Sequence, residues 1–199
     1  MKKILIIISG LGLIVLIIGV YFLFFQRSAE QNKEANIDFK FMANLILKSP
    51  AFNNNEPIPS KYTCDSQNIN PPLQIENIPL GTKSLVLIMD DPDATGGVTW
   101  DHWLIWNLNP DLRIIEENQV PAGAIQGTTS FGEIKYGGPC PPRGSKPHRY
   151  MFKLYALDSI LNLPAGASKA DIEKAINIEK AINSRVLGRT VLIGLYSRR

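Results

Sequence analysis

The sequence has only two histidines, His102 and His148, and two cysteines, Cys64 and Cys140, among its 199 residues. The histidines do not stand in the H-x-x-x-H spacing of a helical zinc site. A nucleophile elbow around a serine and a phosphate-binding P-loop are also missing. These absences argue against a zinc enzyme, an enzyme with a nucleophilic triad and a P-loop nucleotide-binding protein, and we predict neither a metal nor a cofactor.

A large excess of basic residues is missing as well. The formal net charge is +3. Lys2 and Lys3 supply two of these charges, so the rest of the chain carries a net charge of about +1. Proteins that bind nucleic acid present a strongly basic face to the phosphate backbone. We therefore do not expect nucleic acid to be a partner.

Charged residues are absent from positions 4–25, a run made almost entirely of Ile, Leu, Val, Phe and Gly. A helix of this length spans about 33 Å, enough to cross a bilayer. Because Lys2 and Lys3 precede it, the positive-inside rule predicts a single-pass anchor with the domain on the extracytoplasmic side. We interpret residues 1–26 as this membrane anchor and residues 27–37 as a polar tether. The alternative is a signal peptide that is cleaved to release a secreted domain.

Residues 38–199 have the composition of one globular domain. Short apolar runs separated by loops rich in proline and glycine predict strands at 39–47, 84–89, 102–108, 148–157 and 190–196. Helix formers are concentrated late in the chain, where the hexapeptide of residues 172–177 is repeated at 178–183. Many short strands with a single late helical segment indicate a mainly β, antiparallel fold.

Both histidines are expected near the start of a strand, and Asp91 and Asp93 near the end of another. Strand ends that meet at one rim of a sheet build small polar pockets. Two inward-facing imidazoles suit an oxyanion such as a phosphate ester, with Asp91 holding a ring in place. The alternatives are that the histidines are structural and that Asp93 and Arg149 form an ordinary ion pair. Period-2 alternation places His102 on one face with Leu104, Trp106 and Leu108.

Four ordered motifs resemble the phosphatidylethanolamine-binding protein family, and most closely its bacterial and archaeal branch, often labelled Raf-kinase-inhibitor-like. The motifs are Asp91-Pro92-Asp93-Ala94, Trp100-Asp101-His102-Trp103, Gly138-Pro139-Cys140-Pro141-Pro142 and His148-Arg149-Tyr150. The resemblance covers about residues 39–199. It implies a large central antiparallel sheet, a smaller second sheet and C-terminal helices.

The resemblance also implies a shallow surface pocket for phosphate-type anions or phospholipid head groups. Carried over by motif, the ligand-binding residues are Asp91, Trp100, His102, Gly138, Pro139, Pro142, His148 and Tyr150, with Asp93 and Arg149 in support. Cys64 and Cys140 belong to the motifs of this branch. The two alternatives for this pair are a disulfide and two buried thiols.

Three functions follow as expectations. The first is a non-enzymatic binding protein that captures a phosphate-bearing small molecule or a lipid head group. The second is a protein-interaction module that inhibits a kinase or a protease through the pocket and its Pro/Gly loop. The third, which the missing nucleophile makes the weakest, is a hydrolase that uses the two histidines.

Overall fold

The computed structural model describes residues 21, 26, 45–176 and 186–198. The chain divides into two units, Met1–Lys40 and Phe41–Arg199. Almost all of the predicted anchor and tether lies outside the described residues. Within the part that is described, no helix is long and apolar enough to cross a membrane. The fold presented here is that of the second unit.

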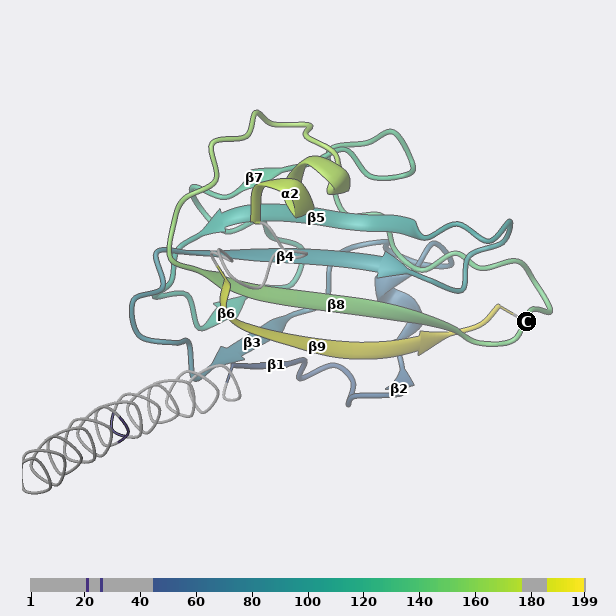
Figure 1. Ribbon diagram of the computed structural model, residues 1–199. Coiled ribbons are helices and arrows are strands. Elements are labelled where there is room, and N and C mark those ends of the chain that lie inside the picture. Colours follow the sequence, from purple (N-terminus) through teal and green to yellow (C-terminus); the bar gives the residue numbers. More distant parts are fainter. Residues whose placement is uncertain (1–20, 22–25, 27–44, 177–185, 199) are drawn as a thin grey trace, which may run out of the picture. The chain divides into compact units, whose positions relative to one another are not determined.

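A six-stranded sheet forms the centre of the domain (Figure 1). Its strands, in spatial order, are β2 (Glu56–Pro57), β9 (Val186–Tyr196), β8 (His148–Leu157), β4 (Ser84–Asp91), β5 (Trp100–Leu108) and β7 (Ile125–Gln126). Neighbours are antiparallel except β2 and β9, which are parallel. All eight residues of β4 are buried, which explains its continuous apolar run.

A three-stranded antiparallel sheet packs against one face of this central sheet. It consists of β1 (Ile46–Lys48), β3 (Leu73–Glu76) and β6 (Ile114–Ile115), with β3 in the middle. Leu73 and Ile75 point into the core that the two sheets share, where they pack with Phe152 and Leu154 of β8. The prediction of a large and a small sheet is therefore confirmed.

The helix α2 (Lys169–Ile176) covers the other face of the central sheet. Ile172 and Ile176 are fully buried there with Leu104 and Trp106 of β5. At its start, Ser168 and Asp171 bond each other as a capping pair. Besides α2, the only helical element within residues 45–176 and 186–198 is a 3₁₀ turn, η1 (Ser60–Tyr62), and the predicted extension through the second hexapeptide lies outside the described residues.

The predicted faces of β5 were wrong at its far end. β5 contains an extra residue near Asn107, whose φ is +56°, so the pairing with β4 shifts there. A bulge of this kind reverses the alternation of side chains beyond it. Leu108 consequently packs between the two sheets with Ile105, not under the helix with Leu104 and Trp106.

Candidate ligand-binding site

A cavity of about 270 Å³ lies at one end of the central sheet, where three strands meet. β4 ends at Asp91, while its neighbours β5 and β8 begin at Trp100 and His148. Because neighbouring antiparallel strands run in opposite directions, the end of β4 lies beside both starts. The cavity is lined by residues from these ends and two loops: Asp91, Ala94, Thr95, Trp100, His102, Phe131, Cys140, Pro141, Pro142, His148 and Tyr150.

Asp91 fixes the orientation of the His148 ring. Its Oδ2 atom lies 2.8 Å from His148 Nδ1, and both side chains are more than nine-tenths buried. Its other oxygen, Oδ1, accepts the backbone N–H of Asp93 at 2.8 Å. An ionised carboxylate only accepts hydrogen bonds, so His148 Nδ1 carries a proton. The second ring nitrogen, Nε2, is then the one that His148 can present to a ligand.

His102 reaches the cavity through a second bulge in β5. The pairing of β5 with β4 passes from Trp103 to Asp101 and skips His102. Strict alternation had predicted that His102 shares a face with Leu104, and this was wrong. Leu104 packs on the helix side, whereas the His102 ring lies edge-on to Tyr150 on the other side, with centroids 5.1 Å apart. The bulge therefore turns this imidazole towards the cavity.

Hydrogen bonding also fixes the tautomer of His102. Nδ1 lies 2.6 Å from the carbonyl oxygen of Gly137, which can only accept, so Nδ1 donates. The N–H of Gly137 returns a bond to the His102 carbonyl at 2.9 Å. Burial lowers the pKa of His102, against the opposing effects of the Gly137 bond and the nearby Asp91 charge. The ring is therefore neutral at pH 7, with its lone pair on Nε2.

The hydroxyl of Tyr150 is buried and has no hydrogen-bond partner among the described residues. Burial, followed by the negative charge of Asp91, raises the pKa of Tyr150, so the group is a neutral donor. The backbone of Cys140 acts in the opposite direction, and neither Cys140 nor Asp91 meets the hydroxyl with the geometry of a hydrogen bond. Leaving a buried hydroxyl unpaired costs roughly 1–3 kcal/mol. A ligand oxygen in the cavity would remove that cost.

The Pro/Gly loop forms a wall of fixed shape. Cys140 is joined by a disulfide to Cys64, whose N–H donates to the carbonyl oxygen of Pro139 at 3.1 Å. Gly138 lies so close to the neighbouring backbone that a Cβ there would come within 2.4 Å of the Tyr62 carbonyl oxygen. The loop is thus fastened covalently and by close packing to the segment that follows η1.

The structure brings together most of the residues that the motifs suggested for ligand binding. The cavity is lined by Asp91, Trp100, His102, Pro142, His148 and Tyr150. Gly138 instead lines a neighbouring hollow, and Pro139 lines neither. Their contribution is to hold the wall in place.

Phe131 is the main residue that the sequence analysis missed, together with Ala94 and Thr95. Its ring stands edge-on to Trp100 and His102, with centroids 5.5 and 5.4 Å away. It lies in an irregular, Gly-rich segment that predicts no strand or helix. An aromatic residue directly before Gly132 was the only available signal, and such a pattern is not specific.

Asp93 and Arg149 form a two-pronged ion pair beside the cavity. Arg149 donates from Nε at 2.8 Å, from Nη2 at 2.7 Å and from its backbone N–H at 2.9 Å. The bond from Arg149 holds the pKa of Asp93 down at about 2. Neither residue lines the cavity, so the pair ties the start of β8 to the loop after β4.

Within residues 45–176 and 186–198, no three His, Cys, Asp or Glu side chains are grouped so that they could hold a metal ion. The polar groups that the cavity offers to a ligand include one nitrogen of each imidazole and the Tyr150 hydroxyl.

A two-sheet β domain with a polar cavity at the strand ends belongs to the class of ligand-binding β proteins. The protein-family model for phosphatidylethanolamine-binding protein matches residues 48–197 of the chain. The chain therefore belongs to the phosphatidylethanolamine-binding protein family, which confirms the resemblance seen in its motifs.

Relatives of known sequence or structure agree with this assignment. A UPF0098 protein of the archaeon Methanothermobacter thermautotrophicus is 49% identical over 159 residues, which cover 77% of this chain and 99% of that protein. The crystal structure of Escherichia coli YbcL, described as a member of the mammalian PEBP family, matches with a TM-score of 0.72 and 27% identity. The matched region covers 79% of this chain and all of YbcL.

A third relative bears on cellular location. LppC of Mycobacterium tuberculosis, described as a lipoprotein, is 38% identical over 144 residues, which cover 72% of this chain and 71% of LppC. That description belongs to LppC, and in the present chain no cysteine stands directly after the apolar run of residues 4–25, the first being Cys64. The membrane anchor and the extracytoplasmic location stay predictions from the sequence.

Proposed function

We propose that the protein is a non-enzymatic binding protein whose surface cavity captures a phosphate-type anion, either free or as part of a phospholipid head group. One observation carries the proposal: two imidazole rings and an unpaired tyrosine hydroxyl converge on a single cavity. The family name, which describes binding and not catalysis, supports it.

The charge of Asp91 has to be reconciled with an anionic ligand. Both Asp91 oxygens are engaged, one by His148 and the other by the backbone of Asp93. With a proton on both of its nitrogens, the His148 ring keeps its bond to Asp91 and offers an N–H from Nε2 to a ligand. His102 becomes a donor at Nε2 in the same way. Together with Tyr150, three donors are then available to the oxygens of one phosphate group.

The walls of the cavity strengthen such bonds. Trp100, Phe131, Pro141 and Pro142 are apolar and line the space beside the donors. Hydrogen bonds to an ionised group are roughly twice as strong as neutral ones, and apolar surroundings reduce their screening by water. A small oxyanion in this cavity would meet donors on one side and apolar surface on the other.

Nuclear magnetic resonance on the full-length, ¹⁵N-histidine-labelled protein in a maltoside detergent tests the proposal. With only two histidines in the chain, the variant His148→Gln assigns both sets of imidazole signals. We expect millimolar inorganic phosphate and phosphoethanolamine to shift the Nε2 signals of His102 and His148. Lys61→Gln, which changes an exposed charge outside the cavity, is the matched control and should bind as the parent does.

Imidazole signals that stay unchanged with both inorganic phosphate and phosphoethanolamine at millimolar concentration would contradict the proposal. If phosphoethanolamine shifts them and inorganic phosphate does not, the ligand is the head group and not the free ion.

A protein-interaction function is the second candidate, because the wall presents an exposed and rigid loop at residues 142–147. A kinase or protease that docks on this loop should be retained by His148→Ala and lost when the loop is replaced. A phosphoesterase assay on the same preparation tests the hydrolase alternative.

A further inference from the structure

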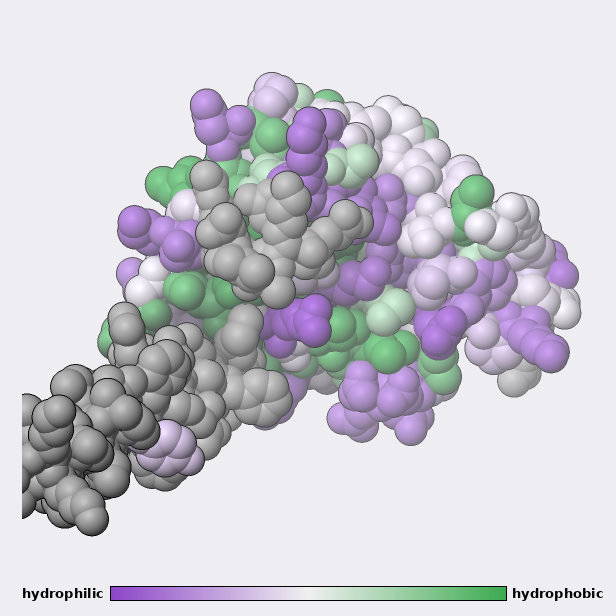
Figure 2. Space-filling view, viewed as in Figure 1, coloured by the Kyte–Doolittle hydropathy of each residue, from purple (hydrophilic) through white to green (hydrophobic). Residues whose placement is uncertain are grey.

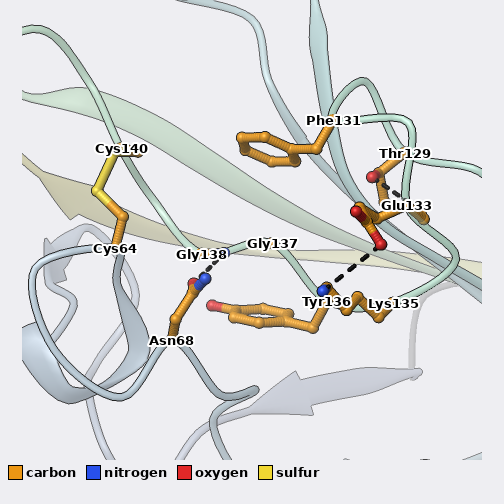
Figure 3. Close-up of a pocket in the computed structure, with 10 residues that line it drawn as sticks. All are labelled: Cys64, Asn68, Thr129, Phe131, Glu133, Lys135, Tyr136, Gly137, Gly138 and Cys140. Atoms are coloured by element: carbon orange, nitrogen blue, oxygen red, sulfur yellow. Dashed lines mark hydrogen bonds and ion pairs between the residues drawn. A yellow bond between two sulfur atoms is a disulfide. The ribbon is translucent and has the colours of Figure 1, made fainter.

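A second hollow of about 220 Å³ lies next to the candidate site. Figure 3 shows the rings of Phe131 and Tyr136 on opposite sides of it, with the Cys64–Cys140 disulfide towards one end. Glu133 and Lys135 stand at the other end, where they pair at 3.5 Å and remain more than half exposed. Charged groups thus border only the mouth of the hollow.

Two polar atoms among the lining residues already bond protein partners. The hydroxyl of Tyr136 donates to the Tyr62 carbonyl at 2.8 Å, and Asn68 Oδ1 accepts the N–H of Gly138 at 2.7 Å. The Tyr136 ring also packs edge-on against Trp103, with centroids 5.6 Å apart. The first cavity contains an unpaired hydroxyl, whereas this hollow presents mainly ring faces and sulfur. It is suited to an apolar group.

One side chain separates the two spaces. Phe131 and Cys140 line both of them. The Phe131 ring lies directly over Gly137, where a Cβ would come within 2.5 Å of the ring. Phe131 as a whole is 44% exposed. It therefore stands as a partition between the imidazole cavity and the apolar hollow.

The backbone that carries Phe131 is held firmly. Thr129 bonds Glu133 from both its N–H and its hydroxyl, each at 3.0 Å, and the N–H of Gly132 closes the turn onto Thr129. Ser130 and Asp101 exchange two further hydrogen bonds. These bonds fix the turn from which the Phe131 side chain projects.

We propose that the hollow is a second subsite, which takes an apolar group carried by the phosphate ester bound in the first cavity. The inference rests on the proposed function. The ligand class is then a phosphate ester with a compact apolar substituent, and Phe131 packs against that substituent. A cavity of on the order of 150 Å³ already accommodates benzene, so the hollow is large enough for a phenyl ring or a short alkyl chain.

Titration calorimetry on the full-length protein in a maltoside detergent, with matched probes, tests the subsite. The probes are inorganic phosphate, phenyl phosphate and the short-chain lipid dihexanoylphosphatidic acid. We expect at least one of the two esters to bind 10-fold or more tightly than inorganic phosphate. The tighter of the two identifies the source, a soluble aromatic ester or a lipid. In parallel, nuclear Overhauser effects are expected between the phenyl protons and the Tyr136 ring.

Two variants of Lys135 test whether the tighter binding of the esters comes from the hollow. Lys135→Trp places a large ring at the mouth of the hollow, while Lys135→Met removes the same charge and adds less bulk; both change an exposed side chain outside the first cavity. In Lys135→Trp the ester should bind no more tightly than inorganic phosphate, whereas in Lys135→Met it should still bind more tightly. If inorganic phosphate shifts the histidine signals but both esters bind no tighter, the subsite is wrong and the proposed function stands. If neither phosphate nor phosphoethanolamine shifts either histidine, the proposed function fails and the subsite fails with it.

Discussion

Single polar atoms decide what this cavity can bind. His102 and His148 each donate from Nδ1 to a protein acceptor, so each ring has one nitrogen left to face a ligand. In the neutral rings that nitrogen is an acceptor, which does not suit an anion. We therefore expect binding of a fully ionised oxyanion to be coupled to protonation of the His102 ring.

This coupling predicts that oxyanion affinity rises as the pH falls from 8 to 6. Burial lowers the pKa of His102, so the free protein lacks this proton at neutral pH, and a bound anion raises the pKa again. Sulfate is a suitable probe because its own charge does not change in this range. Uptake of one proton increases affinity by up to about tenfold per pH unit. We expect His102→Gln to flatten this dependence, and a flat profile in the parent protein would contradict the coupling.

The Tyr150 hydroxyl leads to a second prediction. Tyr150→Phe removes a buried hydroxyl that has no partner, so the free energy of unfolding should stay the same or rise by up to about 1 kcal/mol. Phosphate affinity should nevertheless fall several-fold, because one donor is lost. Chemical denaturation and calorimetry measure the two effects.

Tyr62→Phe is the matched control for Tyr150→Phe. The Tyr62 hydroxyl donates to Glu117 at 2.7 Å and does not line the cavity. Its removal should destabilise the fold by about 1 kcal/mol and leave phosphate affinity unchanged. The reverse pattern, a large stability loss for Tyr150→Phe with normal affinity, would show that the Tyr150 hydroxyl is structural.

The strands and loops position these polar atoms. The sequence predicted the strands better than it predicted the bulges and turns within the fold. The bounds of β8 agree with the prediction because a long apolar run between loops is a strong signal. The two bulges of β5 could not be predicted, since a bulge depends on pairing with β4 and not on local sequence. His102 therefore lines the expected cavity, although strict alternation would have placed it on the opposite face of the sheet. Phe131 was missed for a related reason: its turn is defined by tertiary hydrogen bonds.

The helix α2 is tied to the central sheet by a buried charge cluster. Asp90 is fully buried and accepts bonds from Lys153 and Lys169, each at 2.6 Å. Burial by itself would lower the pKa of Lys169, but the bond to Asp90 and the charges of Asp90 and Asp101 raise it. Asp90 and Asp91 are consecutive, so this cluster and the ligand cavity lie on opposite faces of the same strand.

Lys169→Met should lower the free energy of unfolding by roughly 1–3 kcal/mol, because Asp90 then keeps only Lys153 as a cationic partner. Lys174→Met, an exposed change on the same helix, should cost less than about 0.5 kcal/mol. Urea denaturation of both variants checks the difference. Equal stabilities would mean that α2 is held by Ile172 and Ile176 alone.

The disulfide joins two loops that are 76 residues apart in the sequence. On the chain-entropy account, a crosslink over this distance stabilises the fold by about 4 kcal/mol. The double variant Cys64→Ser/Cys140→Ser should lose most of this stability and bind phosphate more weakly, because Cys140 lines the cavity. Reductant should reproduce both effects in the parent protein and leave the double variant unchanged.

At the scale of the whole molecule, net charge contributes little to location. A formal net charge of +3, most of it before residue 4, gives no strong attraction to anionic membranes. Figure 2 shows hydrophilic and hydrophobic residues interspersed over the visible face of the domain. We therefore expect the apolar run at residues 4–25, and not the visible face of the domain, to supply any lasting contact with a membrane.

This dependence predicts separate behaviour for the two parts of the chain. The full-length protein should sediment with membranes and resist extraction by salt, while a chain that begins at residue 38 should be recovered without detergent. Because every residue that lines the cavity lies between Asp91 and Tyr150, the shortened chain should bind phosphate with the affinity of the full-length protein. Mass spectrometry of the full-length protein distinguishes a retained anchor from a cleaved signal peptide, which would leave a shorter chain in the soluble fraction. If the shortened chain folds but no longer binds phosphate, the first 37 residues contribute to the site, and the assignment of binding to the β domain alone is wrong.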